Sequence, residues 1–138
     1  MQINRELLNS AVYRIAFYPQ SVGAIKLYTA KPQVPTLIGE MNNDLVATEI
    51  QLNDMLRIAN NYDFEAVDQN GDDILKRKIN VAIAAIRVMT KAMEIVGGEG
   101  FYRGFGLEQL FRDVQTARYH PLSESEQVMF SGESLLRD

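Results

Sequence analysis

The clearest pattern in the chain is a run of apolar residues at helical spacing between Asp72 and Val96. Apolar residues recur every three or four positions there, in two neighbouring stripes. The stripes consist of Leu75, Ile79, Ala82, Ile86, Met89, Met93 and Val96, and of Ile74, Val81, Val88 and Ile95. The opposite face carries Arg77, Asn80, Arg87, Lys91 and Glu94. So broad an apolar face predicts a helix packed against more than one neighbour, as in a helical bundle.

Turn-forming and capping residues mark both ends of this helix. The preceding segment Asn70–Asp73 predicts a turn, with acidic cap residues near the positive end of the helix dipole. Gly97 and Gly98 follow the last apolar position, and they predict that the helix ends in a left-handed conformation.

Two further helices are predicted before this one. A long helix is expected from Thr36 to about Asn60, and a polar loop is expected to follow it as far as Gly71. Its buried stripe is predicted to be Met41, Leu45, Leu52, Met55, Leu56 and Ala59. The segment from about Gln2 to Ala30 has a helical pattern, which Pro19 is expected to kink or break. A stiff, extended connection over Lys31–Pro35 should join the two.

Two shorter helices are predicted after the glycine-rich loop Gly97–Gly106. The first has an apolar face made of Leu107, Leu110, Phe111 and Val114. Ser123 and Glu126 have the spacing of a capping box, which predicts a last helix ending near Leu136. The sequence therefore predicts an all-α, up-and-down bundle of about four or five helices, in a single domain that spans residues 1–138.

Composition and charge exclude several classes of function. The chain has no cysteine, which excludes disulfides, thiolate metal sites and cysteine nucleophiles. It has one histidine, so a zinc site of the usual His-rich kind is not expected. The net charge of −4, with scattered basic residues, argues against nucleic acid as a partner. With neither a membrane span nor a signal peptide in the sequence, we expect a cytoplasmic protein.

One stretch points to a known family. Residues 94–113, EIVGGEGFYRGFGLEQLFRD, place a Gly-Gly-x-Gly loop after a long helix, followed by Leu-Glu and then Arg-Asp in a short helix. In this order and spacing they resemble the C-terminal helical domain of the acyl-CoA dehydrogenase family. Arg14 nine residues before Gly23, and more loosely Ile38–Met41, resemble the upstream helices of that domain.

The resemblance implies an FAD-dependent oxidoreductase that acts on CH–CH groups of acyl-CoA thioesters. In this family the segment ending in Gly-Gly helps to bind FAD across a subunit interface. The matching cofactor-binding positions are Glu94, Ile95, Val96, Gly97 and Gly98, to which we add Ser123, Glu124 and Ser125 at the start of the last helix. The family usually has glutamine at the position of Glu94, and an ionised carboxylate cannot donate a hydrogen bond to a pyrophosphate. The alternative is that the two glycines only cap a helix.

The catalytic carboxylate of the family has no counterpart here. In register, Pro121 stands at the position of the usual glutamate, and Tyr13 stands at the position that some members use instead. A phenol with an ordinary pKa near 10 is a poor base at neutral pH. His120, beside the vacant position, is the candidate catalytic residue, and Arg14 is the candidate substrate-binding residue. Each has a structural alternative, as a surface histidine and as a member of an ion pair.

Other departures limit what the chain is expected to do alone. An Arg-x-x-Phe-Gly motif that contacts FAD in the family is replaced by Lys31–Pro35, and the family's N-terminal helical and β-barrel domains are absent from these residues. We therefore expect a C-terminal fragment or small subunit, homodimeric or homotetrameric, which joins a partner that carries the missing flavin-binding domains. The alternatives are a catalytically inactive oligomerising bundle and a flavin monooxygenase-type relative that uses His120.

Two groups near the loop receive structural expectations. Arg112 and Asp113 are expected to form a partly buried salt bridge or helix cap. The aromatic residues Phe101, Tyr102 and Phe105 are expected to pack within the loop rather than to offer a stacking surface.

Overall fold

A computed structural model describes residues 30–137, apart from the side chain of Tyr62. In this part of the chain the regular elements are all helical, which confirms the predicted all-α class. The helices are α3 (Val34–Ala59), α4 (Asp68–Val96), α5 (Leu107–Val114) and α6 (Glu124–Leu135), and short 3-10 turns lie over Asn60–Tyr62, Gly97–Phe101, Arg103–Phe105 and Gln115–Arg118. The segment before Ala30, with its expected helix and Pro19, lies outside the described residues.

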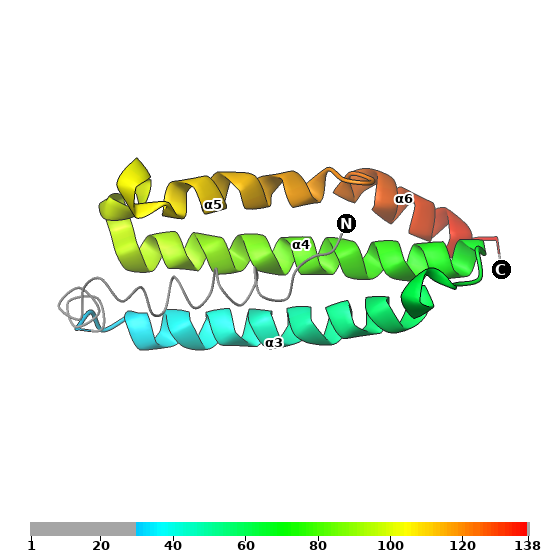
Figure 1. The fold of residues 1–138 in the computed structure, drawn as a ribbon, viewed down its shortest axis with the longest axis horizontal. Coiled ribbons are helices and arrows are strands. Elements are labelled where there is room, and N and C mark those ends of the chain that lie inside the picture. Colours follow the sequence, from blue (N-terminus) through cyan, green and yellow to red (C-terminus); the bar gives the residue numbers. More distant parts are fainter. Residues whose placement is uncertain (1–29, 138) are drawn as a thin grey trace.

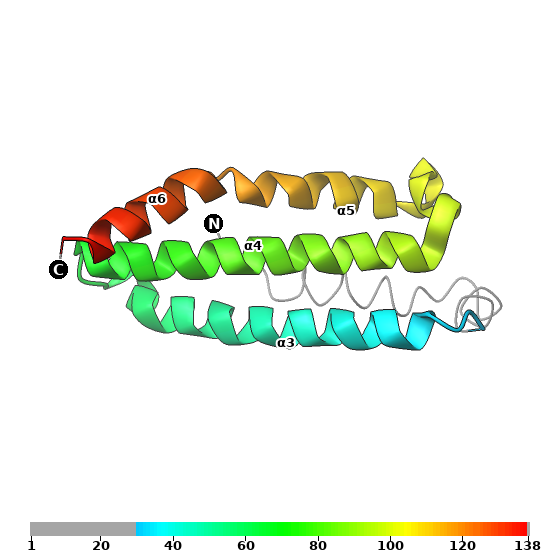
Figure 2. The ribbon, with the colours of Figure 1, turned by 180° about the vertical axis from the view of Figure 1, so that it is seen from behind.

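The longest helix, α4, runs through the middle of the arrangement. α3 lies antiparallel along one side of it, while α5 and α6 follow one another along the other side (Figures 1 and 2). The loop between α4 and α5 is at one end of the molecule, and the connection between α3 and α4 is at the other (Figure 1). This placement confirms that α4 packs against more than one neighbour, as its broad apolar face predicts.

The main hydrophobic core lies between these layers, toward the end where α4 leads into the glycine-rich loop. It comprises Val34, Leu37 and Met41 of α3, Val88, Met89, Ala92, Met93, Ile95 and Val96 of α4, and Leu107 of α5. Leu45, Leu110, Phe111 and Val114 pack against it and are partly buried. Removal of each of the larger side chains, from valine upward, from water contributes roughly 1.5–3 kcal/mol, so this cluster holds the three helices together.

The start of α4 differs from the prediction. The helix begins at Asp68, four residues earlier than expected, so Asn70 and Gly71 lie inside its first turns. Backbone bonding explains this, because the Gly71 amide donates to the Val67 carbonyl oxygen at 3.1 Å and continues the helix. Asp72 is not an exposed cap residue, since it is only 2% exposed.

The predicted buried stripe of α3 is partly wrong. Met41 is buried, as predicted, but Leu56 is 62% exposed. Ile38, Val46 and Ile50 are exposed too, because among the described helices α3 packs mainly against α4, on its other side. Val34, Leu37 and Thr48 instead complete the buried face toward α4.

The polar face of α4 is not simply a solvated surface. Arg77, Arg87 and Lys91 form ion pairs with carboxylates of α3. Within residues 30–137 no helix is both long and apolar enough to cross a bilayer. The same residues contain no group of three or more acidic, histidine or cysteine side chains that could hold a metal ion.

Candidate functional site

The glycine-rich loop is the first candidate, and its geometry depends on individual glycines. Gly97 ends α4 with φ 73° and ψ −147°, a conformation essentially limited to glycine but different from the left-handed one expected. Gly106 has φ 76° and directs Leu107 into the core. Gly100 is buried, and a Cβ there would lie 3.0 Å from Met93 Sδ. The three glycines let the loop fold tightly onto the end of α4.

The aromatic residues of this loop do not pack into the core. Phe101 is 67% exposed, Tyr102 is 72% exposed and Phe105 is 41% exposed, so the prediction that they pack within the loop is wrong. The reason is that Gly100, rather than a large side chain, occupies the space beside Met93 and Leu107. The rings are therefore left on the outer side of two successive 3-10 turns.

The predicted cofactor-binding residues Glu94–Gly98 differ in their surroundings. Glu94 is exposed, whereas Ile95 and Val96 are buried in the core, so only their backbone could face a cofactor. Lys31 donates from Nζ to the Ile95 carbonyl oxygen at 3.4 Å, which places a cation at the negative end of α4. Carbonyl groups and the carboxylate of Glu94 dominate this helix end. It permits close backbone approach to a pyrophosphate, but the compensating positive charge has to come largely from elsewhere.

The turn before α6 is the second candidate, because it holds Pro121, at the position where the resemblance predicts a catalytic glutamate. The His120–Pro121 peptide bond is cis, and both side chains are exposed. Lys78 of α4 donates from Nζ to the Leu122 carbonyl oxygen at 3.0 Å and so attaches the turn to the bundle. Burial lowers the pKa of Lys78. The sequence pattern does not identify Lys78 as a contact residue. Its contact with Leu122 arises only because the turn before α6 lies beside α4 in the folded chain.

These two candidates are not brought together. Lys78 precedes Val96 by 18 positions on α4, which corresponds to roughly 27 Å along the helix at 1.5 Å per residue. The residues assigned to FAD at the glycine loop therefore lie far from His120 and from the start of α6. A ligand that contacted both would have to extend along α5 (Figure 1).

The three predicted cofactor residues at the start of α6 have structural partners. Ser123 caps α6, and the Ser123 amide donates to Glu126 Oε2 at 2.9 Å, so the predicted capping box is present. Ser125 lies 3.2 Å from Ser123 through the two hydroxyl oxygens. Glu124 accepts two hydrogen bonds from Arg118, at 2.5 and 3.0 Å. These contacts account for the three polar side chains without a cofactor.

The remaining predicted residues are partly outside the described region. Arg14 and Tyr13 lie there, so both assignments stay predictions. Arg112 does pair with Asp113, at 3.4 Å between Nε and Oδ1, but the two side chains are 67% and 57% exposed. The predicted partial burial of this pair is therefore wrong, because both residues sit on the outer side of α5.

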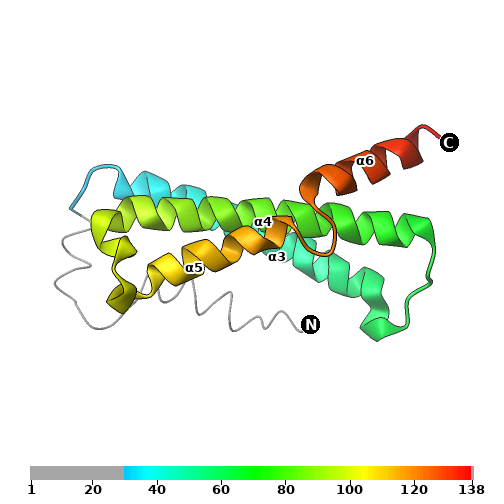
Figure 3. The ribbon, with the colours of Figure 1, turned by 90° about the horizontal axis from the view of Figure 1, so that it is seen from above.

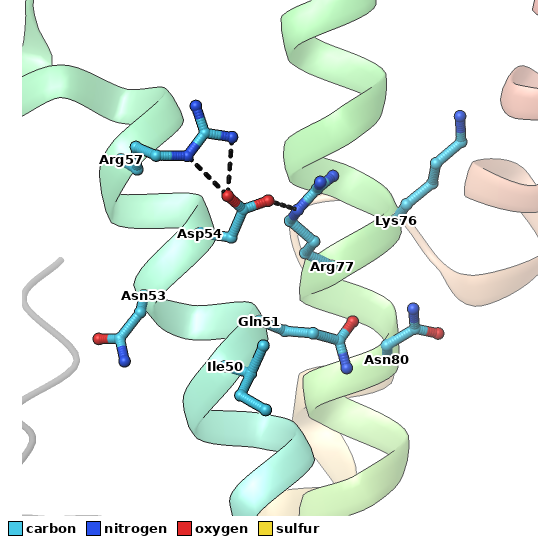
Figure 4. A pocket seen from close by; sticks show the side chains of 8 residues that line it. All are labelled: Ile50, Gln51, Asn53, Asp54, Arg57, Lys76, Arg77 and Asn80. Atoms are coloured by element: carbon cyan, nitrogen blue, oxygen red, sulfur yellow. Dashed lines mark hydrogen bonds and ion pairs between the residues drawn. The ribbon is translucent and has the colours of Figure 1, made fainter.

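A groove between α3 and α4 is the third candidate (Figure 4). Asp54 lies between Arg57 of the same helix and Arg77 of α4, at 2.7 Å and 2.6 Å. The hydrogen bonds from Arg57 and Arg77 lower the pKa of Asp54. Lys76 points away from this cluster (Figure 4) and instead pairs with Asp72. Asp73 also lies 3.7 Å from Arg77, so two carboxylates balance the two arginines. We therefore interpret the groove as a cluster of ion pairs between the two helices rather than as a binding site.

A buried polar network beneath α6 was not anticipated from the sequence. Asp72 accepts a short hydrogen bond from the Ser131 hydroxyl and pairs with Lys76. Gln127 donates from Nε2 to Ser131 Oγ at 2.6 Å. The spacing of Gln127 and Ser131 could have indicated part of this network. The two residues are four positions apart and therefore lie on one face of α6.

The comparison with protein families agrees with the fold. Residues 23–120 match the acyl-CoA dehydrogenase, C-terminal domain. The match spans α3, α4, the glycine-rich loop and α5, and it ends at the turn before α6. Neither a curated protein nor a solved structure matches the chain.

Proposed function

The chain belongs to the acyl-CoA dehydrogenase family through the C-terminal domain of that family, and on this premise we propose that it is the helical component of an acyl-CoA dehydrogenase-like flavoprotein. In this proposal it acts as a C-terminal piece or small subunit, in a homo-oligomer or with a partner. The partner carries the domains that hold the flavin ring. The proposal rests on one observation: the family match covers residues 23–120, which is more than half of the chain.

The glycine loop supports the proposed contact with FAD. Gly97 adopts a backbone conformation that a residue with a side chain rarely adopts, and among residues 30–137 a Cβ at this position would meet nothing within 4 Å beyond its chain neighbours. Gly98 is exposed and is equally open. A phosphate-bearing ligand could therefore approach the backbone closely here. The proposed contact is with the adenosine diphosphate part of FAD, through the backbone of Glu94–Gly98.

The turn before α6 explains why the chain is proposed not to be active by itself. Proline at position 121 has no group that could accept the α-proton of an acyl thioester. Tyr13 at the alternative position would have to lose a proton from a group that ordinarily titrates near pH 10. The proposed component thus contributes to cofactor binding and assembly, whereas a catalytic carboxylate would have to come from the partner.

Flavin binding tests this proposal. The chain would be purified alone and together with its native partner, and FAD would be measured by its visible absorbance and fluorescence. We expect little FAD with the chain alone and a stoichiometric amount with the complex. Glu94→Gln should tighten binding by the complex because it removes a repulsive charge and adds a donor. Glu65→Gln, in the exposed connection between α3 and α4 at the other end of the bundle, is the matched control. A complex that stays colourless with added FAD would overturn the proposal.

A second candidate function is an oligomerising bundle without flavin chemistry. The structural contacts of Ser123 and Glu124 favour it, because they occupy two of the side chains that we predicted to bind the cofactor. A colourless protein that forms a stable oligomer would identify this alternative. The visible spectrum and the oligomeric state together therefore distinguish the two candidates.

A further inference from the structure

The last helix presents its polar side to the protein and an apolar side to the outside. Gln127 and Ser131 face α4 and are buried, at 4% and 8% exposure. The apolar residues Val128, Met129, Leu135 and Leu136 are 60%, 61%, 70% and 89% exposed. Seen from above, α6 leaves the line of α4 at an angle, and its C-terminal end stands clear of the other described helices (Figure 3). We call these four residues the outer face of α6.

The outer face of α6 has a symmetric spacing about Gly132. Val128 and Leu136 are each four residues from Gly132, while Met129 and Leu135 are each three residues from it. At 100° per residue Gly132 also lies on the centre line of the face. A two-fold interface requires a surface that is complementary to itself, and a palindromic arrangement of this kind meets that requirement.

Contacts among residues 30–137 do not explain why position 132 is a glycine. It lies in the interior of α6, where glycine costs about 1 kcal/mol relative to alanine. A Cβ at this position would meet no atom of residues 30–137 outside its own helix backbone and chain neighbours within 4 Å, and the backbone does not adopt a positive φ there. Its small size would, however, allow a second helix to cross α6 closely at the centre of the face.

From these observations we propose that the outer face of α6 is a self-association surface, on which α6 of a second copy of this chain packs antiparallel across a two-fold axis at Gly132. This axis sets Val128 against Leu135 of the partner subunit and Met129 against Leu136 of the partner subunit. The ridge of large side chains on each copy then flanks the glycine of the other.

Charge at the two ends of α6 supports the antiparallel direction. The first turn carries Glu124 and Glu126, and Arg137 follows the last turn. A parallel arrangement would bring the acidic ends together, and it would also align the two helix dipoles unfavourably.

This surface is a property of the chain beyond its family match, which ends at residue 120, before α6. It deepens the homo-oligomeric part of the proposed function and does not depend on FAD. A dimer through α6 in a protein that binds no flavin would uphold this inference and remove the flavin proposal. A protein that binds flavin and assembles without using the outer face of α6 would support the flavin proposal and remove this inference.

Sedimentation velocity of the full chain over about 1–100 µM, the range expected for an interface of modest size, tests the proposal. We expect a dimer, and Met129→Glu or Leu135→Glu should weaken it at least about tenfold by burying a charge in the apolar contact. The control is Ile50→Glu, which changes a residue of α3 that is 64% exposed, and it should leave the dimer unchanged.

A cross-linking variant tests the position of the axis without altering the large side chains. Because the chain has no cysteine, Gly132→Cys introduces a single thiol at the proposed axis. Oxidation should link two copies, since a close antiparallel crossing brings the two Cα atoms within the range of a disulfide. Gly39→Cys, at an exposed glycine of α3 whose Cβ would also be free of contacts, is the control and should not cross-link.

Two results would overturn the proposal. One is a concentration-independent monomer, which would mean that residues 1–29 or a different protein cover this face. The other is a dimer that survives Met129→Glu and Leu135→Glu with equal cross-linking of Gly132→Cys and Gly39→Cys. If the glutamate variants fail to fold, as judged by circular dichroism, the comparison of the two cysteine variants decides the outcome.

Discussion

Arg87 of α4 holds Asp44 of α3 with a forked set of hydrogen bonds. The guanidinium donates from Nε to the two carboxylate oxygens at 3.1 and 3.2 Å, and from Nη2 to Oδ1 at 2.6 Å. This contact raises the pKa of Arg87, chiefly through the hydrogen bond to Asp44. It also fixes the register of the two helices, because Glu40–Lys91 and Asp54–Arg77 follow the same antiparallel pairing.

Removing the central carboxylate of this series should destabilise the pairing of α3 and α4. Asp44→Ala leaves Arg87 and Lys91 without a shared partner, and we expect a loss of about 1 kcal/mol in the free energy of unfolding. Urea denaturation followed by circular dichroism would measure it. The loss should be smaller in high salt. Arg87 is half-exposed, so dissolved ions can screen its attraction to Asp44. Asp63→Ala, in the exposed connection after α3, should have no comparable effect.

The buried carboxylate beneath α6 should make stability depend on pH. Burial alone would raise the pKa of Asp72, but the hydrogen bonds from Lys76 and Ser131 outweigh it, so the pKa is lowered from its ordinary 3.8. The charged form is therefore favoured by folding. This contribution is present above the unfolded-state pKa and is lost as the pH falls through the lowered folded-state pKa.

Asp72→Asn is the variant that tests this contribution. It should cost about 2 kcal/mol at pH 7, because Lys76 loses its buried counter-charge, and it should flatten the fall in stability below about pH 4. Thermal unfolding from pH 3 to pH 7 would measure both effects. Asp73→Asn, at the next position and a third exposed, is the control. A stability profile that Asp72→Asn leaves unchanged would contradict the assignment.

The glycines of the loop should respond in different ways to alanine. Gly97→Ala is strained by the positive φ and should cost about 1–3 kcal/mol. Gly100→Ala should cost about 1 kcal/mol, because its Cβ would press on Met93 and Leu107, and the flexible thioether can give way. Gly98→Ala is the control, since it has open space and no positive φ. Melting temperatures of the three variants would establish the order, and a large effect of Gly98→Ala would contradict this account.

His120 is expected to be dispensable. Its side chain is exposed, and it lies far along the bundle from the glycine loop, because the turn that contains it is attached to Lys78 of α4. His120→Ala should therefore leave both FAD binding and any partner-dependent turnover within about twofold of the wild type, as expected for a surface substitution. Stopped-flow reduction of bound flavin would measure this. Loss of turnover with FAD still bound would instead support the monooxygenase-type alternative.

The sequence by itself determined most of the fold. The period of the apolar residues placed the four described helices, and Ser123 with Glu126 identified the start of α6, because these signals depend on neighbours along the chain. The stretch from Glu94 to Asp113 likewise sufficed to suggest the family, which the match over residues 23–120 bears out.

The tertiary structure decided which side of each helix meets which neighbour. It made Asp72 a buried partner of Ser131 rather than a cap, and it left Phe101 and Leu56 exposed. Such outcomes depend on contacts between residues far apart in the chain, and helical periodicity has no information about them. For the same reason only the structure shows that the apolar side of α6 faces outward, with Gly132 at its centre.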